Sequence, residues 1–359
     1  MRKLDLYISK KFITTFFMAL LLIIGIVIIF DISEKVDYFV KNEAPIKEIV
    51  FDYYMNFVPY FMNMFSPLFV FITVIFFTSK MAANSEFIAM LSGGISYRRI
   101  LLPYIVCSIL IAMLSLGLNL YVIPKSNVTK AEFEQKYIKN RNKFKFRNVH
   151  YQIAPGQFVY VESFSRWNNT AYKFTLETVE NSRLKSKLEA DSAVWDSVGQ
   201  CWRLRNWFIR DYTSGLEDHI RSGERKDTAI ALTITDFYRN EKTVETLNIH
   251  DLNKLIATQN LRGDANVMFA EIELHNRFAM PFSAIILTIM GVCLSSRKKR
   301  GGIGWNLGIG IALAFSYILF QRFSQMFVLT GTLPAVVALW TPNLLFALIT
   351  VFLYTKAQK

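Results

Sequence analysis

The chain alternates between long apolar runs and short charged segments, and each run can be measured as a gap between charged residues. Six gaps are 19, 27, 25, 19, 21 and 33 residues long; they are residues 12–30, 53–79, 100–124, 278–296, 301–321 and 323–355. A hydrocarbon core about 30 Å thick needs roughly 20 helical residues, so each gap can hold one membrane crossing. Gly331 and Pro334 divide the last gap into a turn and a span. The pattern therefore predicts six transmembrane helices.

The first run is expected to remain in the protein. It is longer than the apolar region of a signal peptide, and Asp31 with its charged neighbours follows where a small-residue cleavage site would stand. We therefore count it as the first span.

Residues 125–277 are polar and separate the third span from the fourth. Lys125–Arg147 reads as a charged helical stalk, and Thr246–Leu274 is again helical. Between them, short β-like runs alternate with turns at Pro155-Gly156, Asn168-Asn169 and Ser214-Gly215. The runs are His150–Phe164, Tyr172–Val179, Leu188–Trp195, Cys201–Tyr212 and Ala229–Phe237. Closely spaced strands without intervening helices predict an inserted all-β sandwich or roll.

This pattern gives three parts: spans one to three with a connecting loop 80–99 (residues 1–124), the β domain with its helical connectors (125–277) and spans four to six (278–359). Composition agrees with a membrane protein, because 52% of the residues are hydrophobic and 19% are charged. Soluble domains carry about 25% charged residues.

The net charge of +13 is explained by topology. With the N-terminus in the cytoplasm, the inner segments 1–11, 80–99, 297–300 and 356–359 hold 13 Lys or Arg and two acids, whereas the outer loop 31–52 holds three Lys and six acids. Basic residues concentrate in cytoplasmic segments of membrane proteins. Both termini are therefore predicted to be cytoplasmic and the β domain periplasmic, and nucleic-acid binding is excluded as the reason for the charge.

The loop 80–99 predicts a docking element for a soluble partner, with a membrane-surface turn as the alternative. It carries one acid, Glu86. A short helix is expected between a polar cap at Asn84 or Ser85 and the pair Gly93-Gly94. An apolar face is expected from Phe87, Ile88 and Leu91.

Other motifs exclude several kinds of chemistry. No GxxxxGK[ST] sequence is present, so the chain is not expected to hydrolyse nucleotide itself. The four histidines lack metal-ligand spacing, and no cofactor is expected. Small residues recur every four positions in the fifth span, which suits close helix packing within the chain or a subunit or gate contact; they are Gly304, Gly308, Ala312 and Ser316.

Basic residues near the outer ends of the spans suit anionic lipid headgroups, although snorkelling or solvation explains any single one. They are Lys35, Lys41, Lys47, Lys125, Lys130 and Arg322.

Several strings, in this order, resemble the LptF/LptG (YjgP/YjgQ) family of lipopolysaccharide-export permeases over essentially the whole chain. They are Leu4–Ile8, Ser85–Ser96, Val122–Pro124, Glu273–Phe282 followed by Gly291 and the basic Arg297–Arg300, Leu333-Pro334 and Trp340–Asn343. Of the two paralogous types, LptG is favoured. Asp31 stands where some members carry a basic residue, and Lys35 follows a turn later.

The resemblance implies a periplasmic β-jellyroll and a pair of related permeases that enclose a cavity lined by the first, second and fifth spans. It also implies a separate LptB-type ATPase dimer at the inner face and periplasmic bridge proteins of the LptC/LptA type. Lipopolysaccharide would enter sideways from the outer leaflet of the inner membrane and pass through the jellyroll. Coupling to the ATPase is carried over to Glu86 and its neighbours Phe87, Leu91, Gly94 and Arg98.

Two other function classes stay open from the residues alone. A membrane-anchored enzyme would act on a sugar or lipid through its β domain, but no cluster of carboxylates for such chemistry is apparent. A sensor or scaffold would bind a ligand outside and signal through the inner loop. The permease reading is preferred, with ATP hydrolysis on a separate chain.

Overall fold

The computed structural model describes residues 3–138, 146–165, 167–181, 183–212, 219–230, 232, 234, 244–262, 264, 266–296 and 302–357. The chain divides into two compact units. The bundle unit comprises Met1–Ile138, Glu245–Ile249 and Glu271–Lys359, and the sheet unit comprises Lys139–Val244 and His250–Ala270. The predicted basic turn Arg297–Arg300 and the turn Ser214-Gly215 lie outside the described residues.

The bundle unit contains six helical segments long and apolar enough to cross a membrane: Lys3–Lys41, Ile46–Ala83, Tyr97–Ile138, Val267–Ser295, Gly304–Leu329 and Ala335–Ala357. The prediction of six spans is confirmed. The first segment is a single helix, α1 (Lys3–Lys41), of 39 residues. At 1.5 Å per residue it is about 58 Å long, far more than the hydrocarbon core needs. Its polar end turns therefore extend beyond the apolar gap.

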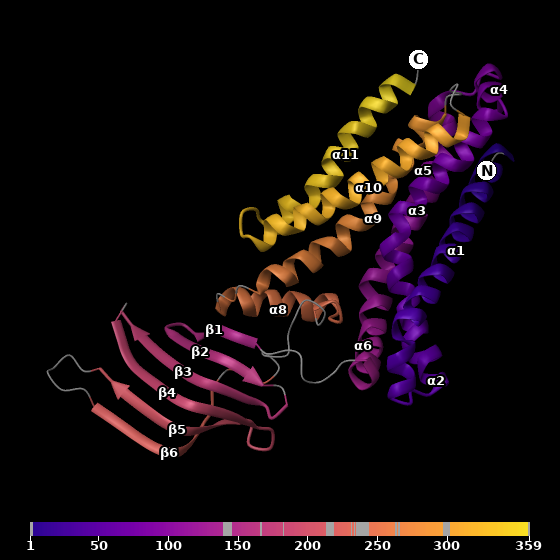
Figure 1. The fold of residues 1–359 in the computed structure, drawn as a ribbon. Helices are drawn as coiled ribbons and strands as arrows, with labels where there is room; N and C mark the ends of the chain where they lie inside the picture. The colour runs from indigo at the N-terminus through magenta and orange to yellow at the C-terminus, as the bar shows by residue number, and fades with distance from the viewer. Residues whose placement is uncertain are drawn as a thin grey trace. The chain divides into compact units, whose positions relative to one another are not determined.

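The remaining bundle elements follow in chain order (Figure 1). They are α2 (Ile46–Glu48), η1 (Ile49–Tyr54), α3 (Met55–Ala83), α4 (Glu86–Ser92), α5 (Tyr97–Gly117), η2 (Leu118–Val122), α6 (Ile123–Phe133), η3 (Glu134–Ile138), α9 (Val267–Ser295), α10 (Gly302–Leu329) and α11 (Ala335–Ala357). Gly331 adopts a φ of +71° between α10 and α11, and α11 starts directly after Pro334. The predicted break in the last apolar run is confirmed.

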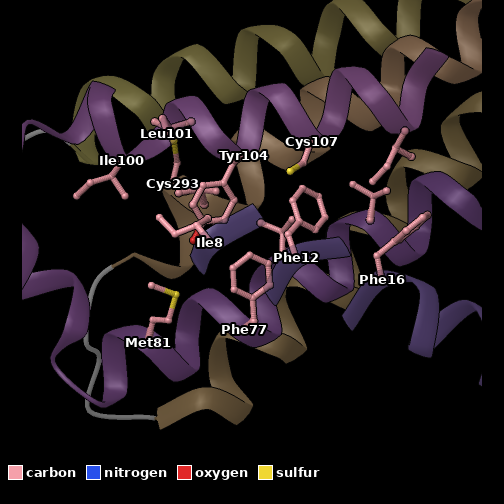
Figure 2. Close-up of a cluster of buried hydrophobic side chains, with 14 of the residues drawn as sticks. Ile8, Phe12, Phe16, Phe77, Met81, Ile100, Leu101, Tyr104, Cys107 and Cys293 are labelled. Atoms are coloured by element: carbon pink, nitrogen blue, oxygen red, sulfur yellow. The ribbon is translucent and has the colours of Figure 1, made fainter. Parts of the chain in front are cut away.

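Helix α3 lies between two apolar cores of the bundle. On one side it packs with α1, α4 and α5 around large buried side chains, among them Phe12, Phe77 and Tyr104 (Figure 2). Phe87 of α4 belongs to the same cluster. On the other it packs with α9, α10 and α11 around Phe71, Ile75, Tyr317 and Phe346. Helix α3 therefore joins α1, α4 and α5 to α9, α10 and α11.

The sheet unit contains one antiparallel sheet in which the strands follow chain order (Figure 1). They are β1 (Phe146–Ala154), β2 (Gln157–Ser165), β3 (Thr170–Glu180), β4 (Arg183–Asp196), β5 (Cys201–Asp211) and β6 (His219–Thr228). Its core includes Phe174, Trp195 and Trp202, and the indole of Trp202 donates to the Leu232 carbonyl at 2.7 Å. The fold class, a membrane helical bundle with an inserted β domain, is confirmed.

Details of this region differ from the predictions. The first four runs are strands, the first being the hairpin β1–β2 around Pro155-Gly156. The described residues of Ala229–Phe237 are not in a strand; the last strand is instead β6, a polar segment. The stalk is helical from Ile123 to Ile138, but Phe146 and Arg147 already belong to β1. The helical prediction for Thr246–Leu274 is confirmed by α8 (Ile249–Arg262) and the start of α9.

Candidate functional site

The connection between α3 and α5 forms a compact helical turn, α4, between two backbone reversals. Ser85 precedes it with a φ of +61°, and Gly94 follows it with a φ of +80°. The expected helix and its end at Gly93-Gly94 are confirmed. Ser85 occupies the N-cap position but makes no side-chain cap bond there. Ser96 caps α5 by accepting from the backbone N–H of Arg99.

Glu86 is held by side chains from two elements. Its Oε2 accepts from the Tyr7 hydroxyl of α1 at 3.0 Å and lies 3.9 Å from the Lys11 ammonium nitrogen. Its Oε1 accepts from the Asn84 side-chain amide at 3.3 Å. The carboxylate is half-buried. It therefore sits at the surface of α4 in a fixed position.

The two faces of α4 have opposite surroundings. Phe87 is 1% exposed and lies in the core with residues of α1, α3 and α5. Ile88 and Leu91 are 51% and 44% exposed. The expectation that these three side chains share one face is wrong. Ile88 is turned about 100° away from Phe87, and Leu91 stays exposed although it follows Phe87 by four residues. Gly94 and Arg98 are exposed next to the apolar pair in sequence.

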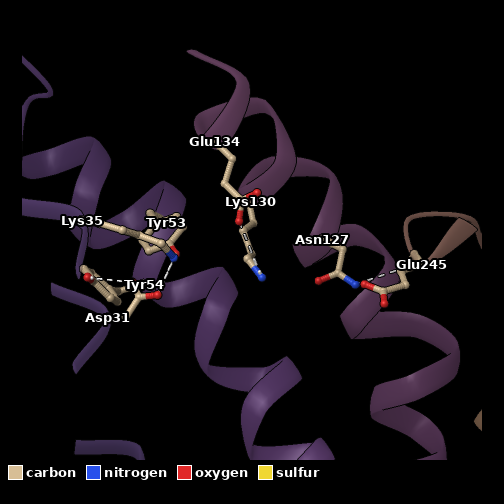
Figure 3. Close-up of polar contacts among 8 residues, drawn as sticks. All are labelled: Asp31, Lys35, Tyr53, Tyr54, Asn127, Lys130, Glu134 and Glu245. Carbon is tan, nitrogen blue, oxygen red and sulfur yellow. Dashed lines mark hydrogen bonds and ion pairs between the residues drawn. The ribbon is translucent and has the colours of Figure 1, made fainter. Parts of the chain in front are cut away.

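At the opposite end of α1, charged and aromatic side chains form a second cluster, which we call the lysine–aromatic cluster (Figure 3). It consists of Asp31, Lys35, Tyr53, Tyr54, Phe57, Tyr60, Phe61, Lys130 and Glu134. Lys35 contacts both Asp31 and the Tyr53 hydroxyl. Asp31 also accepts from the hydroxyls of Tyr53 at 3.2 Å and Tyr54 at 3.1 Å. One carboxylate thus organises a lysine and two phenols from η1.

Lys130 of α6 completes this cluster. Its ammonium lies 5.2–5.7 Å from the ring centroids of Phe57, Tyr60 and Phe61, and 3.9 Å from Glu134. Lys35 lies 5.9 Å from the same Phe57 ring. Aromatic faces attract cations electrostatically, which lowers the cost of holding two lysines in a partly apolar site. The arrangement places two ammonium groups beside one aromatic surface.

The other predicted basic residues do not join this cluster in the described contacts. Lys41, Lys47 and Lys125 are exposed. Arg322 of α10 is exposed and donates to the Gln325 side chain at 3.3 Å. Lys35 and Lys130 were predicted from the sequence. The residues that hold Lys35, which are Asp31, Tyr53 and Tyr54, and the partner of Lys130, Glu134, were not predicted for this role.

The small-residue stripe of α10 lies on its outward face. Gly304 and Gly308 have no atom within 4 Å of a built Cβ, and Ala312 and Ser316 are exposed. Close packing inside the bundle uses a different glycine, Gly310, whose Cβ would fall 2.2 Å from Ile75 Cδ1. The stripe is therefore not an intramolecular packing surface in the described structure.

A polar network inside the bundle was also missed. Asn63 of α3 bonds Asn119 at 2.7 Å and Ser115 at 2.6 Å, and Asn119 donates to the Arg277 carbonyl. The Arg277 guanidinium is 3% exposed and bonds Glu273 at 2.7 Å and the Leu247 carbonyl at 2.8 Å. Two features of the sequence could have indicated this network: Asn63 within an apolar run and the charge of Arg277 at the edge of a span. Within the described part of the chain, no group of three His, Cys, Asp or Glu could hold a metal.

Comparison with known proteins identifies the family. The model of a family described as lipopolysaccharide export system permease LptF/LptG matches residues 6–356. The comparison with curated proteins returned no match. The matched region includes Glu86, the lysine–aromatic cluster and the sheet, and it covers all six spans except Lys3–Asp5 and Ala357. The chain therefore belongs to the LptF/LptG family of lipopolysaccharide export permeases, as its sequence strings predict.

Proposed function

We propose that this permease extracts lipopolysaccharide from the inner membrane with energy from a separate ATPase and passes it towards the outer membrane through its β domain. The family and the six apolar helices make it a multi-pass protein of the inner membrane. Pulling a lipid from a bilayer costs about 0.8 kcal/mol per CH₂. Several acyl chains therefore require an external energy source.

The observation that carries the proposal is the construction of α4. Phe87 anchors it in the core, while Ile88 and Leu91 present an apolar surface beside the fixed carboxylate of Glu86. Exposed apolar residues next to one oriented charge suit docking of a soluble protein with a complementary cation. We assign this surface to a cytoplasmic ATPase dimer of the LptB type.

We also propose an orientation for the chain from the position of this surface. Both chain ends lie at the end of the bundle that carries α4 (Figure 1). The inner segments of the proposed topology are rich in Lys and Arg, which favours the cytoplasm for this end. The sheet unit is then periplasmic, where bridge proteins of the LptC/LptA type would receive the lipid.

The lipid path is proposed to run along the least buried helices. Of the six apolar windows, those of α1 and α10 have the smallest buried shares, 22% and 28%. The stripe Gly304–Ser316 lies on the outward face of α10. A paralogous permease facing α1 and α10 would enclose an apolar space for the acyl chains. Small residues permit the close approach of its helices.

The lysine–aromatic cluster is proposed to bind the anionic headgroup. Lys35 and Lys130 keep 19% and 18% of their side chains exposed. Their paired acids, Asp31 and Glu134, neutralise them until a phosphate of the lipid competes for the ammonium groups. Lys41, Lys125 and Arg322 would add a more diffuse attraction from the surface.

Glu86→Ala tests the proposal in the complex reconstituted with its ATPase. We expect the variant to fold, because Phe87 still packs in the core. We expect the lipopolysaccharide released per ATP hydrolysed to fall at least about tenfold, because an interfacial charge pair is lost. Glu34→Ala, an exposed glutamate near the other end of α1, is the matched control. Full coupling in Glu86→Ala, or failure of any ATPase to copurify with the wild type, would count against the proposal.

A further inference from the structure

The first three turns of α1 contact the α4 region at separate points. Asp5 pairs with Arg99 of α5 at 2.7 Å. Tyr7 donates to Glu86 at 3.0 Å. Ile8 and Phe12 lie in one core (Figure 2), and Phe87 of α4 is buried in the same core. The beginning of α1 is thus attached to α4 through both polar and apolar contacts.

The polar attachment is a relay of three side chains. Lys11 donates to the Tyr7 hydroxyl at 2.8 Å, and its ammonium lies 4.9 Å from the centre of the Tyr7 ring. The hydroxyl in turn donates to Glu86 Oε2. Lys11 is 3.9 Å from that oxygen, beyond hydrogen-bond distance. Only a group that both accepts and donates can stand between an ammonium and a carboxylate here, which a phenol does.

This relay matters because one face of α1 is open along most of the helix. Its apolar window is the least buried of the six, and it carries exposed large side chains such as Met18, Leu21 and Leu22. Its packed face places Ile8, Phe12, Phe16 and Leu20 in the core shared with α3, α4 and α5. The points that join α1 to α4 lie in its first turns.

We propose that Tyr7 and Lys11 are positioning residues that fasten α1 to Glu86, so that a displacement of α4 moves α1 with it. The inference rests on the proposed function, in which α4 receives the motion of the ATPase and α1 borders the lipid path. Tyr7 orients Glu86 at the docking surface and at the same time transmits its movement. The apolar contact of Phe87 keeps α4 folded when the relay is cut.

A distance measurement tests the attachment. Spin labels are placed at Leu22→Cys on α1 and Ala89→Cys on α4, both exposed, in a Cys201→Ser background of the full chain in nanodiscs. Leu22 lies 15 residues beyond Tyr7, about 22 Å along α1. Because Tyr7 contacts Glu86 of α4, the label on α4 lies at a similar distance from Leu22, in the range that pulsed electron paramagnetic resonance measures. We expect Tyr7→Phe to broaden the distance distribution. Tyr38→Phe, also on α1 and 47% exposed against 44% for Tyr7, leaves it unchanged. An unaltered distribution in Tyr7→Phe overturns the inference.

Transport measurements in the assembled complex give the second arm. Tyr7→Phe and Lys11→Met are expected to lower lipopolysaccharide released per ATP roughly three- to tenfold, with the ATPase rate retained. Glu86→Gln combined with Tyr7→Phe is expected to lose no more than Glu86→Gln alone, because both changes cut one relay. Additive losses overturn the inference. The spin-label measurement does not depend on transport. A wild-type complex that moves no lipopolysaccharide would therefore contradict the proposed function, while the spin labels would still test whether Tyr7 attaches α1 to α4.

Discussion

At the scale of single residues, Phe87 and Ile88 show how one short helix is both anchored and available. They are consecutive, yet one is 1% exposed and the other 51% exposed. Phe87 contacts the core shared by α1, α3 and α5, whereas Ile88 lies on the surface with Leu91. Stability and docking are therefore assigned to different side chains, and substitutions can separate them.

Phe87→Ala is expected to destabilise the chain by about 3 kcal/mol, because it leaves a cavity in a well-packed core. Ile88→Ala, its matched control, should change stability by less than about 0.5 kcal/mol. Thermal unfolding of the detergent-solubilised chain measures both. Equal losses of stability in the two variants would contradict the assignment of the two faces.

The candidate sites were only partly predictable at this scale. Glu86 stood out in the sequence as one acid in a short loop between two apolar runs. Its partner Tyr7 is 79 positions away, and Tyr53 is 22 positions from Asp31. Such pairs depend on how the helices cross, which periodicity within one segment does not encode. Lys35 and Lys130 could be identified by their charge. Nothing in the sequence distinguished Tyr53 and Tyr54 from the other tyrosines.

At the scale of elements, α10 uses different faces for different contacts. The sequence singled out Gly304, Gly308, Ala312 and Ser316 by their spacing, but the face against α3 contains Gly310. Asn306, one turn before Gly310, donates to Ser79 of α3 at 3.2 Å. The spacing of small residues predicts that another helix packs closely against them, but it does not identify that helix.

Gly310→Ala and Gly308→Leu should therefore affect different assemblies. Gly310→Ala forces a methyl group against Ile75 and is expected to destabilise the isolated chain by about 1–3 kcal/mol. Gly308→Leu should leave the isolated chain intact and weaken pairing with the paralogous permease about tenfold or more, an overpacking cost of at least about 1.4 kcal/mol. Unfolding curves and copurification of the pair measure these effects. Normal pairing in Gly308→Leu would remove the stripe from the subunit contact.

The sheet illustrates a limit of sequence patterns. Strand β6 was missed because His219–Thr228 is polar and mostly exposed along its length, so it lacks the alternation that marks a half-buried strand. It is held by its pairing with β5. Conversely, Ala229–Phe237 alternates, yet Ile230, Leu232 and Ile234 pack against the core of the sheet from outside any strand. Here one segment pairs as a strand and a different segment packs on the core. The alternation of apolar and polar residues does not distinguish the two.

The turn between β4 and β5 is expected to depend on pH. Asp196 accepts from the backbone N–H groups of Val198 and Gly199 and pairs with Arg203 at 2.7 Å. The two backbone hydrogen bonds, followed by Arg203, hold the pKa of Asp196 below its ordinary value. A lowered pKa means that the ionised form stabilises the fold above the unfolded pKa of about 3.9. That contribution is lost as pH falls through the folded pKa.

Hydrogen–deuterium exchange of the full chain checks this expectation. Asp196→Asn should reduce amide protection in residues 197–202 at neutral pH. The difference from wild type should disappear at low pH, where the native carboxyl is also neutral; comparing the two proteins at each pH cancels the intrinsic dependence of exchange. A difference that persists unchanged at low pH would show that charge on Asp196 is not its source.

At the scale of the whole molecule, the proposed function requires α4 and the inserted sheet to face opposite sides of one membrane. The bundle carries α4, the proposed docking helix, at the end where both termini lie (Figure 1). The sheet is inserted between the third and fourth spans, an odd number of crossings after the N-terminus. Three crossings place the sheet on the side opposite the N-terminus, provided that each apolar helix spans the membrane. The parity relates the sides of the N-terminus and the sheet to each other, and the distribution of Lys and Arg is what favours the cytoplasm for the N-terminus.

Labelling with a membrane-impermeant maleimide tests the parity directly. Val198 is 96% exposed in the β4–β5 turn, and Ala89 is exposed on α4. In a Cys201→Ser background, the remaining Cys107 and Cys293 are buried and should stay unlabelled. We expect Val198→Cys to react in spheroplasts and Ala89→Cys to react in inverted membrane vesicles. If both react from the same side, an apolar helix does not cross, and a docked ATPase could not drive lipid towards the sheet from across the membrane.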